Sequence, residues 1–276
     1  MICCYRIFER GVIDTLNITR NRILLLLLLI FICESSLLAE NHYNFPQFTQ
    51  ETGDFLHQPF KWRGNDWLRL GLVTGGLVLV MQVDQPIRDA VIRDHRKYYY
   101  SVPVEAGRIW GEWYTPAIFA VAFGLHGWLA DNSSSKKIGF EIAQSVIYSE
   151  TITQTLKFVI GRARPYENQG AFSFHPFTLS GIGFQSLPGG HNTEGWALST
   201  VLSRNAHSTT LKILAYTPAL LTFIARVYED QHWTSDDFLG ATIGFVVGSW
   251  VVNHHEKKKS AVNVSAIYPF TISLSF

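Results

Sequence analysis

Apolar residues along the chain gather in long runs separated by polar segments, a pattern typical of helices that pack against one another. The runs predict helices over 68–83, 115–130, 136–160, 192–204, 209–226 and 236–254. Residues 40–65 are polar and aromatic without clear periodicity, and residues 84–100 predict a surface helix and a loop. We therefore expect an all-α fold, a helical bundle of about six helices.

The two ends of the chain have patterns of their own. Phe270, Ile272, Leu274 and Phe276 alternate with hydroxyl residues, which is the period of a strand and predicts a short C-terminal β tail over 256–276. At the other end, a leader with four arginines precedes the apolar run 23–32, and small residues follow it up to Ala39. This order predicts a signal peptide over 1–39, with an uncleaved anchor as the alternative.

The composition narrows the class of protein. The chain is 47% hydrophobic and only 16% charged, which favours a membrane-associated protein or one with a large buried core. Its formal net charge is +1, so it has no basic footprint for nucleic acid. The cysteines all lie within the predicted signal peptide, and its cleavage leaves no thiol chemistry. These residues are Cys3, Cys4 and Cys33.

Two cations stand near the end of the predicted helix 136–160. Lys157 and Arg164 are seven residues apart, nearly two helical turns, so we expect them on one face, with Pro165 ending the helix and Arg162 off that face. Cations stacked in this way repel each other unless an anion lies between them. The spacing therefore indicates an anion site, although dipole complementation at a helix end is the ordinary structural explanation.

A glycine loop precedes the next predicted helix. Gly189, Gly190 and His191 follow Pro188, and Asn192 is the expected N-cap. Backbone amides at a helix N-terminus bind anions, so this loop is a second candidate for the same site. Alone, a Gly-Gly pair is more often a simple turn.

The third candidate segment lies around residues 225–240. Arg226 ends one predicted helix, His232 lies in the connection, and Asp236 follows four residues later. A carboxylate at this spacing can accept a proton from one ring nitrogen and leave the other as a nucleophile. Thr234 and Asp237 fit a capping box for the last helix. These helix ends fall on one side of the bundle, so we expect the active site at that end.

The three segments together resemble the type 2 phosphatidic acid phosphatase (PAP2) superfamily, which includes vanadium haloperoxidases and bacterial acid phosphatases. The family pattern is Lys-x6-Arg-Pro, then Pro-Ser-Gly-His, then Ser-Arg-x5-His-x3-Asp. All three spacings are present here, with Gly189 and Ala225 in place of the two serines. The resemblance covers residues 66–255, which leaves 40–65 as an N-terminal extension.

The resemblance implies a phosphatase that needs no metal or cofactor and is inhibited by vanadate. It would hydrolyse lipid phosphates or isoprenoid and lipid pyrophosphates. His232 would attack phosphorus and form a phosphohistidine, Asp236 would orient it, and His191 would protonate the leaving alcohol. The phosphate would be held by the remaining motif residues, which are Lys157, Arg164, Arg226, Gly189 and Gly190.

Two other functions stay open. Gly189 cannot donate a hydroxyl, so the chain is alternatively a weakened member that binds phospholipid phosphates without turnover. A vanadate-dependent haloperoxidase uses the same pocket. We expect Gly189→Ser to add a donor, unless glycine is present for dihedral angles that serine cannot adopt.

Basic residues at the helix ends away from the site indicate an orientation. If the helices span a membrane, the positive-inside rule places those ends in the cytoplasm and the site outside. We therefore expect an exported protein of the bacterial cell envelope, membrane-associated, with its site on the periplasmic face; the number of spans stays open. The basic residues are Lys136, Lys137, Arg204, Lys212 and Lys257–Lys259.

Overall fold

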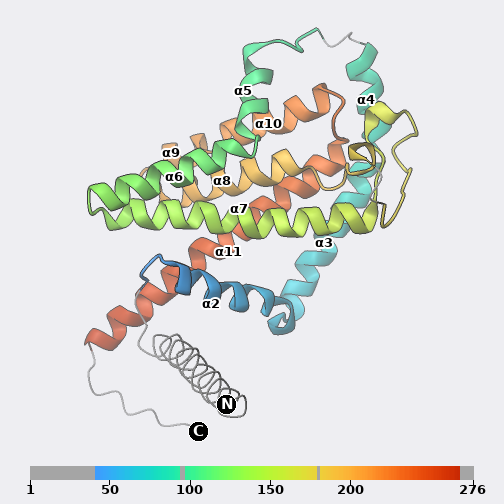
Figure 1. Ribbon diagram of the computed structural model, residues 1–276. Coiled ribbons are helices and arrows are strands. Elements are labelled where there is room, and N and C mark those ends of the chain that lie inside the picture. Colours follow the sequence, from blue (N-terminus) through green and yellow to red (C-terminus); the bar gives the residue numbers. More distant parts are fainter. Residues whose placement is uncertain (1–40, 94–96, 179–180, 268–276) are drawn as a thin grey trace, which may run out of the picture. The chain divides into compact units, whose positions relative to one another are not determined.

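The computed structural model describes residues 41–93, 97–178 and 181–267, with side chains described up to Glu256. It divides into two units, and the account below concerns the unit Tyr43–Lys257. Its helices are shown in Figure 1. They are α2 (Phe45–Leu56), α3 (Gly64–Met81), α4 (Asp84–Arg93), α5 (Val102–Trp110), α6 (Tyr114–Leu129), α7 (Ser133–Ile160), α8 (Gly190–Asn205), α9 (Thr209–Leu214), α10 (Thr217–Tyr228) and α11 (Thr234–Ile267), with 3-10 turns at Gln58–Lys61, Pro165–Glu167 and Ile182–Phe184.

Helix α8 has the most helical neighbours in the bundle, and the long helix α7 packs along one side of it. Helix α7 packs against α6 as well, while α10 packs against α5 and α8 (Figure 1). Ile142, Leu198, Val201 and Val252 form a buried apolar cluster that joins α7, α8 and α11. The all-α prediction is confirmed for the described residues.

Several predicted boundaries differ from the structure. The expected helix 209–226 is two helices, α9 and α10, and α5 was not predicted. The C-terminal β tail is not confirmed, because α11 continues to Ile267 and residues 268–276 lie outside the described part of the chain. The strand period of the last residues says nothing about the segment before them, where α11 extends without interruption.

Helix α2 was not predicted from the sequence. Asn44 caps it by accepting a hydrogen bond from the backbone N–H of Gln47. Its inner face includes Glu51, which accepts from Gln144 at 3.0 Å and lies 2.9 Å from Nε2 of His255. Phe48 and Phe55 on the same helix pack against the buried Tyr148, so α2 has an apolar stripe that the sequence analysis overlooked among its polar residues.

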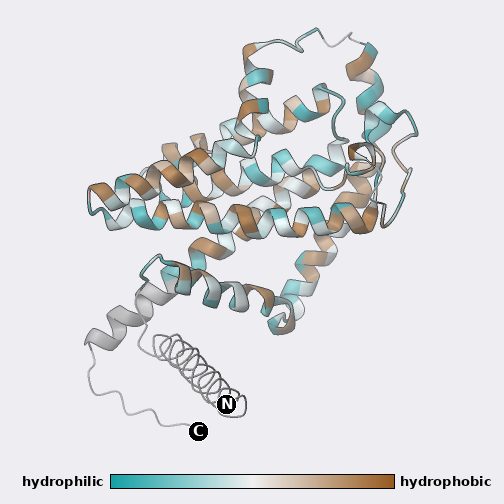
Figure 2. Ribbon diagram, viewed as in Figure 1, coloured by the Kyte–Doolittle hydropathy of each residue, from teal (hydrophilic) through white to brown (hydrophobic). Residues whose placement is uncertain are grey.

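Many large apolar side chains on the outside of the bundle are exposed. Figure 2 shows hydrophobic residues, in brown, along α3 and α6. Among the described residues, one helical stretch, Thr209–Tyr228, has the length and hydropathy of a membrane span, and only 22% of it is buried. Gly64–Met81 and Asp84–Arg93 meet the same test together, with a bend of 43°. By contrast, α7 buries polar residues, among them Glu141, Gln144 and Ser149.

Candidate active site

The first anion-binding segment starts where α7 ends. Gly161 adopts a left-handed conformation with φ of 60°, and its N–H donates to the carbonyl of Lys157 at 2.9 Å. This glycine, not Pro165, terminates the helix, because its conformation is open to residues without a Cβ. Arg164 therefore lies beyond the helix, and the expectation that it shares a helical face with Lys157 was wrong.

Arg164 reaches the site along an extended segment. Its backbone N–H donates to Gly183 at 2.7 Å, and its Nε donates to the Ile182 carbonyl at 3.0 Å. Its Nη1 donates to the backbone and side-chain oxygens of Gln231, at 3.2 and 3.1 Å. Gln231 immediately precedes His232, so these bonds hold a cation next to the predicted nucleophile. The sequence gives no signal for Gln231.

Lys157 lies in the last turn of α7 and is 7% exposed. Its ammonium is 3.2 Å from the position that a Cβ on Gly190 would take, so it stands against the start of α8. Burial and the nearby charge of Arg164 lower the pKa of Lys157 to about 8, against the opposing effect of Glu150. The structure thus brings Lys157, Arg164 and the glycine loop together, as the sequence predicted.

Helix α8 begins at Gly190 with Gly189 as its N-cap. The amides of its first turn have no partner within the helix, which suits an anion. The N–H of Gly189 donates to the Asp236 carbonyl at 2.8 Å and joins the start of α8 to the start of α11. Asn192 is not the cap: it lies inside the first turn, buried, with neither amide atom hydrogen-bonded.

Arg226 completes the group of cations from the last turn of α10. Its Nη1 donates to Glu229 at 2.7 Å, while its buried Nε has no hydrogen-bond partner. Its carbonyl accepts from the backbone N–H groups of Gln231 and His232. The same residue therefore shapes the loop that carries His232 and presents a guanidinium to it.

His232 is 2% exposed, and its Nδ1 lies 3.9 Å from Oδ2 of Asp236. Neither ring nitrogen has a partner with hydrogen-bond geometry. Burial, followed by the charges of Arg164 and Lys157, holds the pKa of His232 well below its usual value. The imidazole is therefore neutral and keeps a lone pair, as a nucleophile requires.

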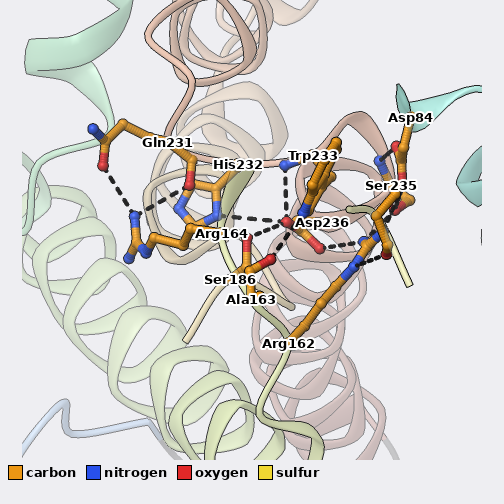
Figure 3. A network of polar contacts seen from close by, with 12 residues as sticks. Asp84, Arg162, Ala163, Arg164, Ser186, Gln231, His232, Trp233, Ser235 and Asp236 are labelled. Atoms are coloured by element: carbon orange, nitrogen blue, oxygen red, sulfur yellow. Dashed lines mark hydrogen bonds and ion pairs between the residues drawn. The ribbon is translucent and has the colours of Figure 1, made fainter. Parts of the chain in front are cut away.

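Asp236 is fixed by several donors (Figure 3). It accepts from Arg162 at 2.7 Å, from the Trp233 backbone N–H at 2.8 Å and from the Ser186 hydroxyl. The bond to Trp233 caps α11, so the predicted capping box of Thr234 and Asp237 was wrong by one residue. The other end of the Arg162 guanidinium donates to Asp84 at 2.8 Å.

Arg162 and Ser186 are the residues of this network that the sequence analysis missed. Arg162 was placed off the functional face because the helix was expected to continue to Pro165. Once Gly161 ends α7, that reasoning no longer applies, and Arg162 turns into the core. Ser186 lies in the long loop before α8, where no periodic pattern indicates which side chains point inward.

His191 faces His232 across the pocket, with ring centroids 6.5 Å apart. Its Nε2 is 3.5 Å from Oε1 of Glu112, another residue that the sequence gave no reason to choose. Burial and then the positive charge of Arg226 lower the pKa of His191 to about 2. A phosphate dianion in the pocket would reverse the electrostatic part of this shift.

The described residues contain no group of three or more His, Cys, Asp or Glu side chains placed to hold a metal ion. Whether the chemistry is independent of metal stays a prediction, which activity in the presence of a chelator tests.

Comparison with known families agrees with this geometry. Residues 139–260 match the model of the PAP2 superfamily, a range that includes every site residue named above except Asp84 and Glu112. This segment of the chain is similar to the PAP2 superfamily. The resemblance read from the three motifs is confirmed.

The chain has curated relatives named lipid A 1-phosphatase. The protein of Porphyromonas gingivalis is 34% identical over 83 residues, which are 29% of this chain and 19% of that protein. The protein of Rhizobium etli is 31% identical over 109 residues, 39% of this chain and 46% of that protein. The chain thus matches less than half the length of either relative.

A solved structure is similar in fold to this chain. It is the first transmembrane PAP2-type phosphatidylglycerolphosphate phosphatase from Bacillus subtilis, with a TM-score of 0.53 and 18% identity. The similarity covers 67% of this chain and 94% of that protein. At this identity the match supports the helical architecture alone.

Proposed function

We propose that this chain is a metal-independent phosphatase that hydrolyses lipid phosphate monoesters through a phosphohistidine intermediate. The observation that carries the proposal is the state of His232. It is a buried, neutral imidazole with three cationic side chains acting on it, from Lys157, Arg164 and Arg226. Such a site attracts a phosphate dianion and holds a nucleophile beside it.

The reaction follows from the positions of the two histidines. Asp236 lies on the Nδ1 side of His232, which leaves Nε2 to attack phosphorus. The P–N bond forms as the P–O bond to the alcohol breaks, and His191 gives its proton to that oxygen. His191 then takes a proton from water, the resulting hydroxide attacks phosphorus, and the P–N bond breaks to release phosphate.

The names of the relatives suggest the first substrate to test. Both are lipid A 1-phosphatases, so lipid A bearing a 1-phosphate is the leading candidate among envelope lipid phosphates. Phosphatidic acid and isoprenoid pyrophosphates belong in the same comparison, because the pocket residues bind phosphate and say nothing about the lipid attached to it.

The outer surface supports a membrane location. The segment Thr209–Tyr228 is apolar and mostly unburied, and α6 exposes Ile118, Val121 and Leu125. Lys136, Lys137 and Arg204 lie at the ends of α7 and α8 away from the pocket. We propose that those ends face the cytoplasm and that the pocket opens at the periplasmic face of the bacterial envelope.

Phosphate release from a substrate panel tests the function. We expect release from at least one lipid phosphate in the presence of a chelator, inhibition by vanadate, and no release by His232→Ala. Binding of lipid phosphate without release from any substrate would favour the binding-only alternative. Halide oxidation by the vanadate-loaded protein would favour the haloperoxidase alternative.

A further inference from the structure

Asp237, the residue after the predicted orienting carboxylate, has no role in the mechanism above. It is fully buried in the first turn of α11, and neither carboxyl oxygen has a hydrogen-bond partner with acceptable geometry. A buried polar group without a partner costs about 1–3 kcal/mol. The Asp237 carboxyl is buried despite this cost in stability and lies next to the proposed reaction site, so its presence needs a physical explanation.

The charge state of Asp237 follows from what faces it. Asp236 lies beside it on α11, Arg226 approaches from α10, Arg164 from the segment after α7, and Asn192 from α8. Burial first, and then the neighbouring Asp236 carboxylate, raise the pKa of Asp237 well above its usual value, despite the opposing effect of Arg226. Burial beside Asp236 therefore favours the protonated carboxylic acid, whose O–H can donate.

Because Gly189 has no side chain, it leaves the space that the Asp237 carboxyl fills. A Cβ on Gly189 would overlap Oδ1 of Asp237 and would lie 3.2 Å from its Cα. The φ of Gly189 is −72°, so the backbone itself does not require glycine. The expectation that dihedral angles might exclude serine here was wrong: the obstacle is the Asp237 side chain. The Asp237 carboxyl thus occupies the space that a side chain at position 189 would fill, within reach of the charges of Arg226 and Arg164.

We propose that Asp237 is a phosphate-binding residue, whose carboxyl O–H donates to a phosphate oxygen from the place that a side chain at position 189 would occupy. This inference rests on the proposed function. It also accounts for Gly189 in a motif where the family pattern has serine: the donor has moved to α11, and glycine leaves room for it. The buried Asn192 amide lies beside the carboxyl and would hold it within the same set, since this amide opposes the rise in the pKa of Asp237.

Two substitutions of Asp237 distinguish a hydrogen-bond donor from a side chain that only fills space. Asp237→Ala removes the donor, and we expect it to weaken vanadate binding and lower kcat/KM by about 10- to 100-fold, the range for a hydrogen bond to a charged group. Asp237→Asn keeps an N–H donor and should lose only about threefold. The melting temperature of each variant establishes that it is folded.

A double substitution tests the exchange of positions. Gly189→Ser alone should reduce vanadate affinity and kcat/KM, because its side chain collides with Asp237. Gly189→Ser combined with Asp237→Ala should recover much of the activity that Asp237→Ala loses, since serine then has both room and a hydroxyl. A non-additive gain in this cycle is the signature of two residues sharing one place.

The proposal is overturned if Asp237→Asn is as damaged as Asp237→Ala, if Asp237→Ala binds vanadate normally, or if the double variant is additive. Failure of the proposed function looks different. If the unmodified protein releases no phosphate from any substrate, the vanadate dissociation constants of the same variants still decide whether Asp237 binds the anion.

Discussion

At the scale of single residues, the pocket holds two neutral histidines that the reaction needs in different states. His232 must stay neutral to attack, and its burial among cations keeps it so. In the proposed reaction His191 must carry a proton when the alcohol leaves, yet burial and then Arg226 lower its pKa to about 2. A phosphate dianion beside His191 favours its protonated form and so opposes the charge-dependent part of this shift.

The two histidines should therefore respond differently to the leaving group. His232→Ala should abolish phosphoenzyme formation with every substrate. His191→Ala should retain phosphoenzyme formation with nitrophenyl phosphate, whose leaving group needs little protonation, and lose it with alkyl phosphates. Rapid quench of radiolabelled protein measures the intermediate. Equal losses by both variants on all leaving groups would mean that these roles are wrongly assigned.

Lys157 should set an alkaline limit on substrate capture. Its pKa is lowered to about 8, so the free enzyme loses this positive charge as the pH rises through that value, well below the range of an ordinary lysine. We expect kcat/KM, which reports the free enzyme, to fall above about pH 8. Lys157→Arg should move that limb to higher pH, whereas Lys136→Arg, at the far end of α7, should not. An unchanged limb in Lys157→Arg would remove Lys157 as its cause.

At the scale of elements, one arginine ties three parts of the chain together. Arg162, just after α7, binds Asp84 at the start of α4 and Asp236 at the start of α11. Ser235 completes the link by donating its backbone N–H to Asp84 at 2.9 Å. The position of Asp236 beside His232 thus depends on a helix more than a hundred residues earlier in the chain.

Replacing this arginine should damage stability as well as activity. Arg162→Met leaves two carboxylates buried without their cation, and we expect a loss of about 3–5 kcal/mol in the free energy of unfolding. Arg69→Ala is the matched control, because Arg69 is 77% exposed in its pair with Asp66 and should cost less than about 1 kcal/mol. Denaturant titration in detergent measures both. Similar losses in the two variants would contradict the role given to Arg162.

The helices also show what sequence patterns can and cannot predict. Motif spacing predicted that Lys157, His191 and His232 lie at one end of the bundle, because each lies at or next to a helix end that the sequence marks with glycine, proline or a polar connection. The pattern did not identify site residues that lie outside helices. Arg162 follows the end of α7 at Gly161, and Gln231 and Glu112 lie in connections between helices. The pattern failed also for α2, whose buried Glu51 reads as a surface position.

At the scale of the whole domain, apolar and polar residues are placed unlike those of a water-soluble bundle. Val121 and Leu125 on α6 are 59% and 50% exposed, while α7 buries Glu141 and Gln144 completely. Outward apolar faces of this kind suit a lipid environment, where the hydrophobic effect does not penalise them.

A membrane contact through α6 should be sensitive to charge. Val121→Lys together with Leu125→Lys places two cations on one exposed face, each costing about 2.5–3.5 kcal/mol at the centre of a bilayer. We expect the variant to float less with phospholipid vesicles than the unmodified chain. Ser134→Lys, at the polar start of α7, serves as the control and should float normally. Undiminished flotation of the double variant would place the membrane contact elsewhere.

The order of the site residues along the chain has a consequence for how the protein is made. Lys157, Arg164 and His191 all precede His232 and Asp236, which stand at the start of α11. At about 5–20 residues per second, a ribosome delivers Lys157 and Arg164 seconds before the nucleophile. Until then the growing chain lacks Arg226 and the Gln231 contacts that hold Arg164 in the pocket. In the proposed mechanism, hydrolysis can begin only once α11 has emerged and its first turn packs against Gly189. Incomplete chains are therefore inactive.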